Sequence, residues 1–241
     1  MNRLVVESKN DKAFVEAVIK HLNNRILTVD ASVDTPICRI DDFECLGGLN
    51  ERKLTTKIED VIDDVLKRGI KKVGVLIDID NEGTNQRLKM VSNCLSKAME
   101  IKFGKPYDIS ISEANQLFDI IIDDNTSFQL ACHFTNVDGK GELETVLKTI
   151  KTQESPFADC LHEWQRCLQA NGKDISQKDF DKFWLSNYVR FDTCSRNDKK
   201  QSEGKCSIQN FDYVMENKSQ IFDFDNNLLE DLKRFLALFN A

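Results

Sequence analysis

Hydrophobic positions follow two alternating patterns over the first 150 residues. Short, nearly continuous apolar runs of strand length are separated by segments in which apolar residues recur every three or four positions, the spacing of an amphipathic helix. Residues 3–8 and 71–80 carry the clearest strand runs. Apolar residues are almost continuous from Val73 to Ile77, which is typical of a parallel strand covered on both faces.

The other segments of this region complete an alternation of strands and helices. We predict further strands at 36–43, 117–123 and 128–136, and helices at 11–22, 50–69, 84–101 and 141–150. Only residues 124–127 separate the last two strands, so we expect a hairpin and a mixed sheet. The alternation predicts an α/β fold with an open, mostly parallel, Rossmann-like sheet and a hairpin at one edge.

The pattern becomes helical and more polar after residue 150. Helices are predicted at 156–172, 176–191 and 226–239, with a polar, glycine-containing loop at 193–205. We therefore expect an α/β domain at residues 1–150 and a helical C-terminal extension, residues 151–241, packed on it.

Composition and charge narrow the class of protein. The chain has 241 residues, is 41% hydrophobic and 30% charged, and carries a net charge of −7, which argues against a nucleic-acid coat protein that relies on a basic face. No apolar run reaches the roughly 18 residues of a membrane span. Charged residues follow the first residue too closely for a signal peptide, so we expect a cytoplasmic protein that does not contact the membrane.

Cysteine usage gives little support for a zinc site. The chain has eight cysteines and three histidines, and no cysteine pair has the C-x-x-C spacing of zinc ligands. With no secretory signal, we expect reduced thiols, mostly buried as small hydrophobic residues. The cysteines are Cys38, Cys45, Cys94, Cys132, Cys160, Cys167, Cys194 and Cys206.

Carboxylates follow two predicted strands at the points where they end. Glu7 ends the first strand, and Asp78 and Asp80 end the strongest one. Residues two apart on a strand point to the same side, and ligands bind at the carboxyl ends of parallel strands. If the strands are neighbours, the three carboxylates converge. Oxygen ligands of this kind suit Mg²⁺ or Mn²⁺.

Two more carboxylates fit the same site. Asp11 and Glu144 each lie near the start of a predicted helix. Each has an alternative interpretation, Asp11 as a helix cap and Glu144 as a negative charge that complements the helix dipole. His133 and His162 lack metal-ligand spacing, so we do not assign them to the site.

The layout of a strand ending in Glu and a later strand ending in Asp-x-Asp resembles the Toprim domain of topoisomerases, primases and several nucleases. The spacing of Glu7 and Asp11, and the Gly-x-Leu-Glu motif at 141–144, resemble the OLD (overcoming lysogenization defect) nucleases and their small stand-alone relatives. The resemblance covers roughly residues 3 to 150. Ser8 stands where Toprim domains usually have glycine. No G-x-x-x-x-G-K-[ST] motif appears in the chain, so the ATPase half of a full-length OLD nuclease is missing.

The helical remainder resembles the tail of an uncharacterised Toprim-like family in which a lysine precedes a Trp-Leu pair. Trp184 and Leu185 form that pair here. The resemblance leaves open whether the lysine is Lys178 or Lys182. We interpret Trp164 and Trp184 as packing residues on helical apolar faces rather than as base-stacking residues.

The resemblance implies metal-dependent phosphoryl transfer on DNA or RNA. It assigns catalysis to Glu7, Asp78 and Asp80 and a cation site to these residues with Asp11 and Glu144. Asp78 and Asp80 would hold one of two ions, Glu7 would bridge or act as acid and base, and Asp11 with Glu144 would hold the second. A lysine, with Lys9, Lys140 and Lys178 as candidates, would stabilise charge on phosphate.

Two other functions remain open from the sequence. The chain is alternatively a non-catalytic Toprim-like module that binds nucleotide, nucleic acid, a partner protein such as a separate ATPase, or a second copy of itself. It is alternatively a receiver-like or Rossmann-like protein in which the aspartates are incidental, because fold analogy transfers function poorly among α/β proteins.

Overall fold

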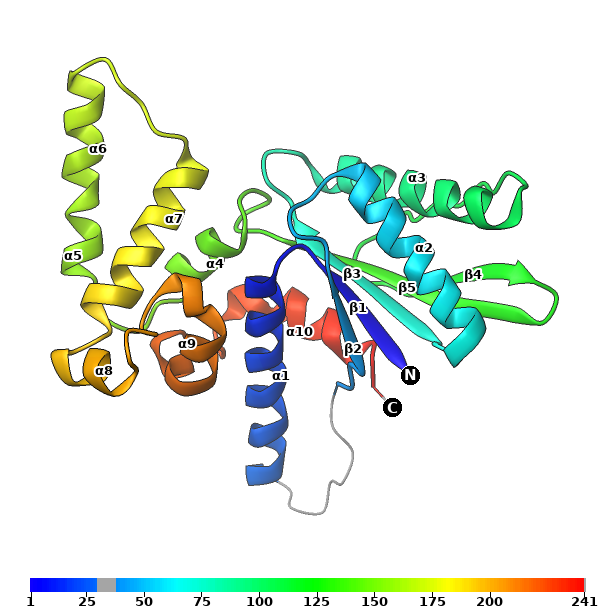
Figure 1. Cartoon of the computed structure of the whole chain (residues 1–241), viewed down its shortest axis with the longest axis horizontal. Helices are drawn as coiled ribbons and strands as arrows, with labels where there is room; N and C mark the ends of the chain where they lie inside the picture. The colour runs from blue at the N-terminus through cyan, green and yellow to red at the C-terminus, as the bar shows by residue number, and fades with distance from the viewer. Residues whose placement is uncertain (30–37, 241) are drawn as a thin grey trace.

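Five strands form one mixed sheet in the order β2-β1-β3-β5-β4 (Figure 1). The computed structural model describes residues 1–29 and 38–240. The strands are β1 Asn2–Val6, β2 Asp42–Cys45, β3 Lys72–Asp78, β4 Phe118–Asp123 and β5 Thr126–Thr135. β1 pairs in parallel with β2 and β3, β3 pairs in parallel with β5, and β4 is antiparallel to β5. The prediction of a mostly parallel α/β sheet with a hairpin at one edge is confirmed.

Helices connect the strands and make up most of the second half of the chain. The α-helices are α1 Lys9–Val29, α2 Glu51–Arg68, α3 Thr84–Phe103, α4 Leu143–Thr149, α5 Pro156–Asp159, α6 Leu161–Ala170, α7 Gln177–Asn187, α8 Arg196–Gln201, α9 Phe211–Lys218 and α10 Glu230–Ala237. The shorter turns are η1 Tyr188–Asp192, η2 Ile208–Asn210, η3 Ser219–Ile221 and η4 Asn227–Leu229.

Several predicted elements differ from the structure in their extent; the helix predicted at 11–22, for example, is longer and forms α1, Lys9–Val29. A strand is predicted at 36–43, and residues 36 and 37 of it lie outside the described ranges. The observed strand β2 is Asp42–Cys45. The helix predicted at 156–172 is divided at Cys160 into α5 and α6. The helix predicted at 176–191 changes at Tyr188 from α-helical α7 to the π-helical turn η1.

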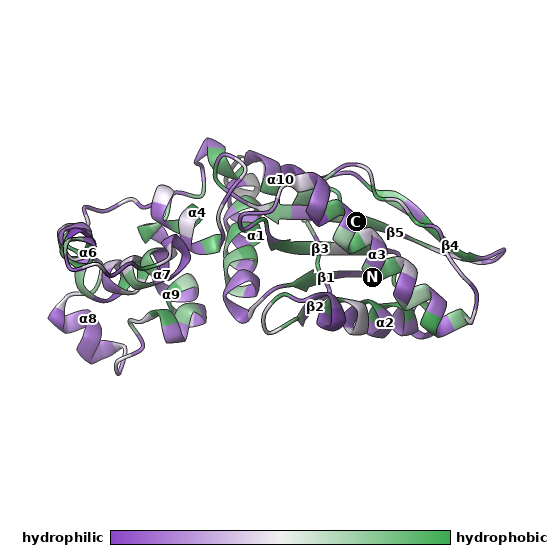
Figure 2. Ribbon diagram, turned by 90° about the horizontal axis from the view of Figure 1, so that it is seen from above, coloured by the Kyte–Doolittle hydropathy of each residue, from purple (hydrophilic) through white to green (hydrophobic). Residues whose placement is uncertain are grey.

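Helices cover both faces of the sheet. α2 and α3 lie on one face, and α1 and α10 lie on the other (Figure 1). Alternate residues of β1 enter the two cores: Val5 packs on the side of α2 and α3, while Leu4 and Val6 pack on the side of α1 and α10. Figure 2 shows apolar residues concentrated on the strands and on the helix faces turned toward them. This explains the nearly continuous apolar runs of the central strands.

The helical part of the chain shares one hydrophobic core with the sheet. Leu76 of β3 belongs to the same buried cluster as Trp184 of α7 and Phe235 of α10. α10 therefore returns to the sheet as a layer of the α/β fold. The boundary at residue 150 remains a prediction, and this core runs across it.

α5, α6 and α7 project from one end of the molecule (Figure 1). α6 contains no buried residue. Trp184 is buried and stacks on Tyr188, whereas Trp164 is 38% exposed and makes an edge contact with Phe183, which is 43% exposed. The packing role predicted for Trp184 is confirmed, while Trp164 packs mainly against another exposed ring.

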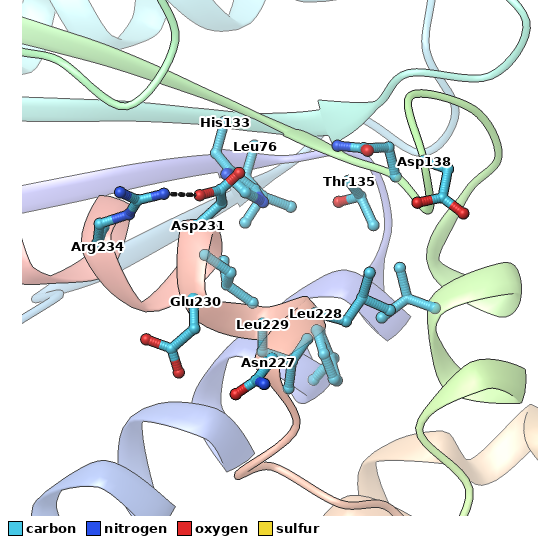
Figure 3. A pocket seen from close by; sticks show the side chains of 14 residues that line it. Leu76, His133, Thr135, Asp138, Asn227, Leu228, Leu229, Glu230, Asp231 and Arg234 are labelled. Atoms are coloured by element: carbon cyan, nitrogen blue, oxygen red, sulfur yellow. Dashed lines mark hydrogen bonds and ion pairs between the residues drawn. The ribbon is translucent and has the colours of Figure 1, made fainter.

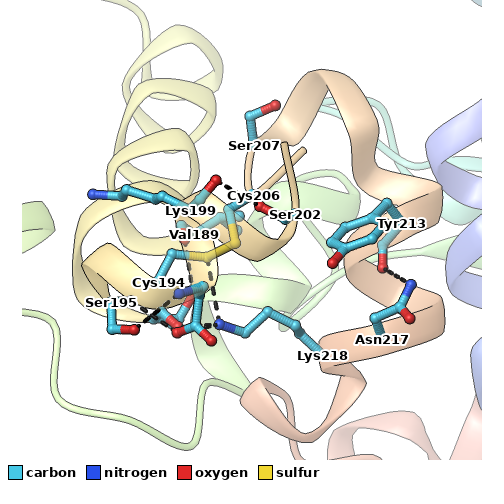
Figure 4. The surroundings of a disulfide bond; sticks show 12 residues. Val189, Cys194, Ser195, Lys199, Ser202, Cys206, Ser207, Tyr213, Asn217 and Lys218 are labelled. Atoms are coloured by element: carbon cyan, nitrogen blue, oxygen red, sulfur yellow. Dashed lines mark hydrogen bonds and ion pairs between the residues drawn. A yellow bond between two sulfur atoms is a disulfide. The ribbon is translucent and has the colours of Figure 1, made fainter. Parts of the chain in front are cut away.

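A disulfide joins Cys194 and Cys206 (Figure 4). The expectation of reduced thiols is therefore wrong for this pair, while the other six cysteines are free. The loop predicted at 193–205 also contains a helix, α8, because Ser195 and Asp198 form a reciprocal capping box at its start. Among the described residues, no helix is both long and apolar enough to cross a membrane.

We predict that Gly74→Ala lowers the melting temperature. A Cβ at this position would lie 2.4 Å from Leu4 Cδ1 and 2.8 Å from a ring carbon of Phe239, and overpacking of a core costs about 1–3 kcal/mol. Thermal unfolding followed by circular dichroism checks this. Gly83→Ser is the control, because a Cβ there meets no atom within 4 Å and serine is a favourable N-cap. Equal melting temperatures for the two variants would contradict the packing of α10 on β3.

We also predict that six thiols react when the protein is denatured without reductant, and eight after reduction. The six are the free cysteines, and the total is the cysteine content of the chain. Mass spectrometry after alkylation counts them, with peptide mapping to locate the protected pair. Eight reactive thiols before reduction would show that Cys194 and Cys206 are not joined in the purified protein.

Candidate functional site

The carboxyl ends of β1 and β3 bring two acidic side chains together. Glu7 immediately follows β1, and Asp78 is the last residue of β3. A Glu7 carboxylate oxygen accepts a hydrogen bond from the backbone N–H of Asp78 at 3.3 Å. The parallel pairing of Val6 with Leu76 places the two strand ends side by side, as expected for neighbouring parallel strands.

Asp11 approaches the same point from the first turn of α1. Its Oδ2 accepts hydrogen bonds from the backbone N–H and the hydroxyl of Ser8, at 2.8 and 2.6 Å. Its Oδ1 is buried and has no hydrogen-bond partner, and the residue is only 3% exposed. Because a buried carboxylate oxygen without a partner costs free energy, this atom is a strong indication of a missing cation or donor.

α4 adds its amino end to the site. The backbone N–H of Leu143 donates to Asp78 Oδ1 at 3.1 Å. Glu144 lies in the first turn of α4, and Glu142 is its N-cap residue. Glu142 is 3% exposed and, like Asp11, has one buried carboxylate oxygen, Oε1, without a partner.

These side chains line a cavity of about 700 Å³. It contains four of the five predicted metal ligands, Glu7, Asp11, Asp78 and Glu144. The full lining is Glu7, Ser8, Asn10, Asp11, Gly48, Asp78, Glu142, Leu143, Glu144, Lys178, Lys182, Ile208 and Gln209. We call this cavity the acidic pocket.

The pKa values of four carboxyl groups in the acidic pocket are raised, that of Glu142 by burial. Burial, together with the nearby charge of Glu7, raises the pKa of Asp11 to about 6. Burial and the charge of Glu142 raise the pKa of Glu144 to about 7. The pKa of Asp78 lies well above its ordinary value because the group is buried and close to Asp11, Glu7 and Glu144. These carboxyl groups therefore keep their protons to a higher pH than ordinary ones, because burial disfavours their charged forms and, in the described part of the chain, ion pairs reach only Glu142 among them.

Asp80 does not line the acidic pocket. The strand predicted at 71–80 ends at Asp78, and Asp80 follows in a left-handed conformation with a φ of 52°. The alternation that was expected to align Asp78 with Asp80 therefore does not apply. Asp80 Oδ2 lies 2.6 Å from Arg87 Nη2, and its Oδ1 lies 2.8 Å from Lys178 Nζ.

Lys178 is the lysine nearest to the carboxylates. Its Nζ lies 2.8 Å from Oε2 of Glu142, and Lys182 Nζ lies 3.8 Å from the same oxygen. Lys9 is exposed and does not line the pocket. Lys140 lines a separate, neighbouring cavity of about 300 Å³ together with Asp80 and Lys178.

Two residues of this site were missed in the sequence. The Gly-x-Leu-Glu motif leaves Glu142 unassigned at its second position, although its place directly after Gly141 is a signal in the sequence. Arg87 lies within α3, is 8% exposed and donates to the backbone oxygen of Ile79 at 3.3 Å. Its place in an otherwise ordinary helix carried no signal.

The residues present fit a hard divalent cation, although the ligand shell is not preassembled. In residues 1–29 and 38–240, no group of three His, Cys, Asp or Glu side chains already has the arrangement of a metal site. The donors around the pocket are oxygens, and Asp11 Oδ1 lacks a partner, which suits Mg²⁺ or Mn²⁺. A cation would have to draw these carboxylates closer together.

A separate cavity of about 420 Å³ lies between the sheet and α10 (Figure 3). His133 lines it and is 7% exposed. Burial lowers the pKa of His133 to about 4, so the ring is neutral, and its Nδ1 lies 2.9 Å from Oδ1 of Asn115. Asp231 and Arg234 lie together on its α10 side (Figure 3). His133 is thus a buried residue of β5 that does not line the acidic pocket.

The fold and the pocket define an α/β protein with an acidic pocket at the carboxyl edge of a mostly parallel sheet. A model of one family matches residues 1–240. The chain belongs to that family, which is described as a protein of unknown function, DUF3226. No curated protein and no solved structure matches the chain.

We predict that Asp11→Asn raises the melting temperature at pH 8 more than at pH 4.5. The unfolded chain loses the Asp11 proton near pH 4, whereas the folded protein keeps it up to about pH 6. The folded state binds more protons between these values, so stability falls as the pH rises through this window. Asparagine removes the charge and still accepts hydrogen bonds from Ser8.

Scanning fluorimetry across this pH range, without divalent cations, checks the prediction. Asp119→Asn is the matched control, because Asp119 is an exposed residue of β4 on the same sheet. A shift of equal size at both pH values would show that the buried charge of Asp11 is not what destabilises the pocket.

Proposed function

We propose that this chain is a Mg²⁺- or Mn²⁺-dependent phosphoryl-transfer protein, and that it acts as a Toprim-type nuclease on nucleic acid. One observation carries the proposal. Four carboxylates, one each from the end of β1, α1, β3 and α4, line one pocket. None of them forms an ion pair with a lysine, arginine or histidine of the described residues. A buried group of this kind is stable in its charged form only when a cation balances it.

The residues have separable roles in this proposal. Glu7, Asp11, Asp78 and Glu144 would hold the cation, which supplies a polarised phosphate and an activated water when bound. The α4 amino end orients Asp78 through the hydrogen bond from Leu143. Lys178 and Lys182 border the pocket and attract a phosphodiester into it.

The negative charge of the protein means that, in this proposal, binding of nucleic acid depends on divalent cations. The net charge of −7 and the acidic pocket both repel a polyanion. Nucleic acid therefore approaches the pocket only after divalent cations reverse its local charge. Cleavage assays on single-stranded and double-stranded DNA and RNA would show which of these nucleic acids is the substrate.

A second candidate function is a non-catalytic module that binds a separate protein such as an ATPase. Exposed aromatic side chains on the projecting helices favour it: Phe157 is 61% exposed, and Trp164 and Phe183 form an exposed pair. Exposed apolar rings mark protein-interaction surfaces. If this candidate is right, the folded protein cleaves no phosphodiester, with or without its pocket carboxylates.

We predict that Asp78→Asn reduces cleavage of nucleic acid at least 100-fold in Mg²⁺ or Mn²⁺, because it removes a central negative charge of the pocket. Asparagine keeps an acceptor for the Leu143 N–H, so the fold is retained and the melting temperature should not fall. Gel assays on labelled single-stranded and double-stranded DNA and RNA, with and without chelator, provide the measurement.

Asp119→Asn serves again as the control and should cleave as well as the parent. Cleavage that survives in Asp78→Asn, or that persists in excess chelator, argues against the proposed site. A parent protein without activity on any of these substrates in either cation favours the binding module instead.

A further inference from the structure

We propose that the ammonium group of Lys178 occupies the position of a second metal ion, so that the acidic pocket binds one divalent cation rather than two. This inference rests on the proposed phosphoryl-transfer function and specifies its cation requirement. It replaces the two-ion arrangement expected from the sequence with one ion and one covalently attached positive charge.

Lys178 is held between two carboxylates from different elements. Its Nζ lies 2.8 Å from Asp80 Oδ1, which follows β3, and 2.8 Å from Glu142 Oε2, which precedes α4. Carboxylate oxygens are also the ligands that a hard divalent cation takes. Here a lysine side chain from α7 supplies the positive charge.

Both oxygens of Asp80 are already used by cationic groups. Arg87 Nη2 lies 2.6 Å from Oδ2, opposite the contact of Lys178 with Oδ1. Arg87 is itself buried and anchored to the backbone oxygen of Ile79. Asp80 therefore lacks a free oxygen for a metal ion while both contacts persist.

Four carboxylates of the acidic pocket, unlike Asp80, form no ion pairs in the described part of the chain. Among the ion pairs of the described residues, none reaches Glu7, Asp11, Asp78 or Glu144. Asp11 is 3% exposed, lines the acidic pocket and keeps Oδ1 without a partner. Arg87 and Lys178 thus balance Asp80 and Glu142. The unpaired carboxylates of the acidic pocket are left for a single diffusible ion.

Lys178 lies between the paired carboxylates and the unpaired carboxylates. It lines both the acidic pocket and the neighbouring cavity of about 300 Å³. It comes from the first turn of α7, which begins at the cap Ser176, whose side chain accepts from the backbone N–H of Asp179. A chelator can remove the diffusible ion, but this second positive charge stays with the chain.

Isothermal titration calorimetry of the full chain with Mn²⁺ at neutral pH tests the inference. We expect one Mn²⁺ per chain for the parent protein. We expect two for Lys178→Met, which keeps the length and apolar character of the side chain but exposes Asp80 and Glu142 to a second ion. Lys178→Arg retains the positive charge and should bind one.

Lys182→Met is the matched control, because Lys182 lies one turn further along α7 and is similarly exposed, at 47% against 45%, but 3.8 Å from Glu142. It should bind one Mn²⁺. Electron paramagnetic resonance of Mn²⁺-loaded Lys178→Met should show a spin-coupled pair, as for ions about 4 Å apart. Circular dichroism confirms that each variant is folded.

The outcomes separate this inference from the proposed function. Two Mn²⁺ per parent chain would overturn the role of Lys178 and leave the metal-dependent function standing. One Mn²⁺ in folded Lys178→Met, or a second ion without spin coupling, would also overturn it. No binding by the parent would count against the metal-dependent function itself.

Discussion

Uncompensated negative charge at the end of β3 is the constraint that organises this protein. Asp78 is buried beside Glu7, Asp11 and Glu144, and its own hydrogen-bond donor comes from the amino end of α4. Lysines from α7 reach only the adjacent carboxylates, Glu142 and Asp80. The helical half is therefore tied to the sheet at its most acidic point, and the balance of charge there depends on contacts between distant parts of the chain.

Much of the sheet could be predicted from the sequence because burial on two faces leaves a strong pattern. The apolar run from Val73 to Ile77 indicated a central strand, and β3 lies in the middle of the sheet between β1 and β5. The hairpin of β4 and β5 followed from their short connection. The end of β3 was not predictable, because the turn at Asp80 depends on its bridge with Gly141, far along the chain.

The candidate site was predictable only in part, because some of its contacts join elements that are distant in the sequence. Glu7 and Asp78 end strands, so topology alone brings them together. Asp11 and Glu144 lie at helix starts, where sequence cannot separate a ligand from a cap. The pairing of Asp80 with Arg87 and Lys178 requires knowledge of where α3 and α7 pack, and no local pattern encodes that.

The return of α10 to the sheet has a consequence for how the molecule folds. Phe235 and Phe239 lie so close to Gly74 that no side chain fits between them and β3, yet the segment from Thr135 to Glu230 separates α10 from β5 in sequence. Contacts of such high contact order form late, because a long loop must close before they stabilise the chain. The part of this face that α10 covers stays open to water until then, and unassisted refolding should compete with aggregation through it.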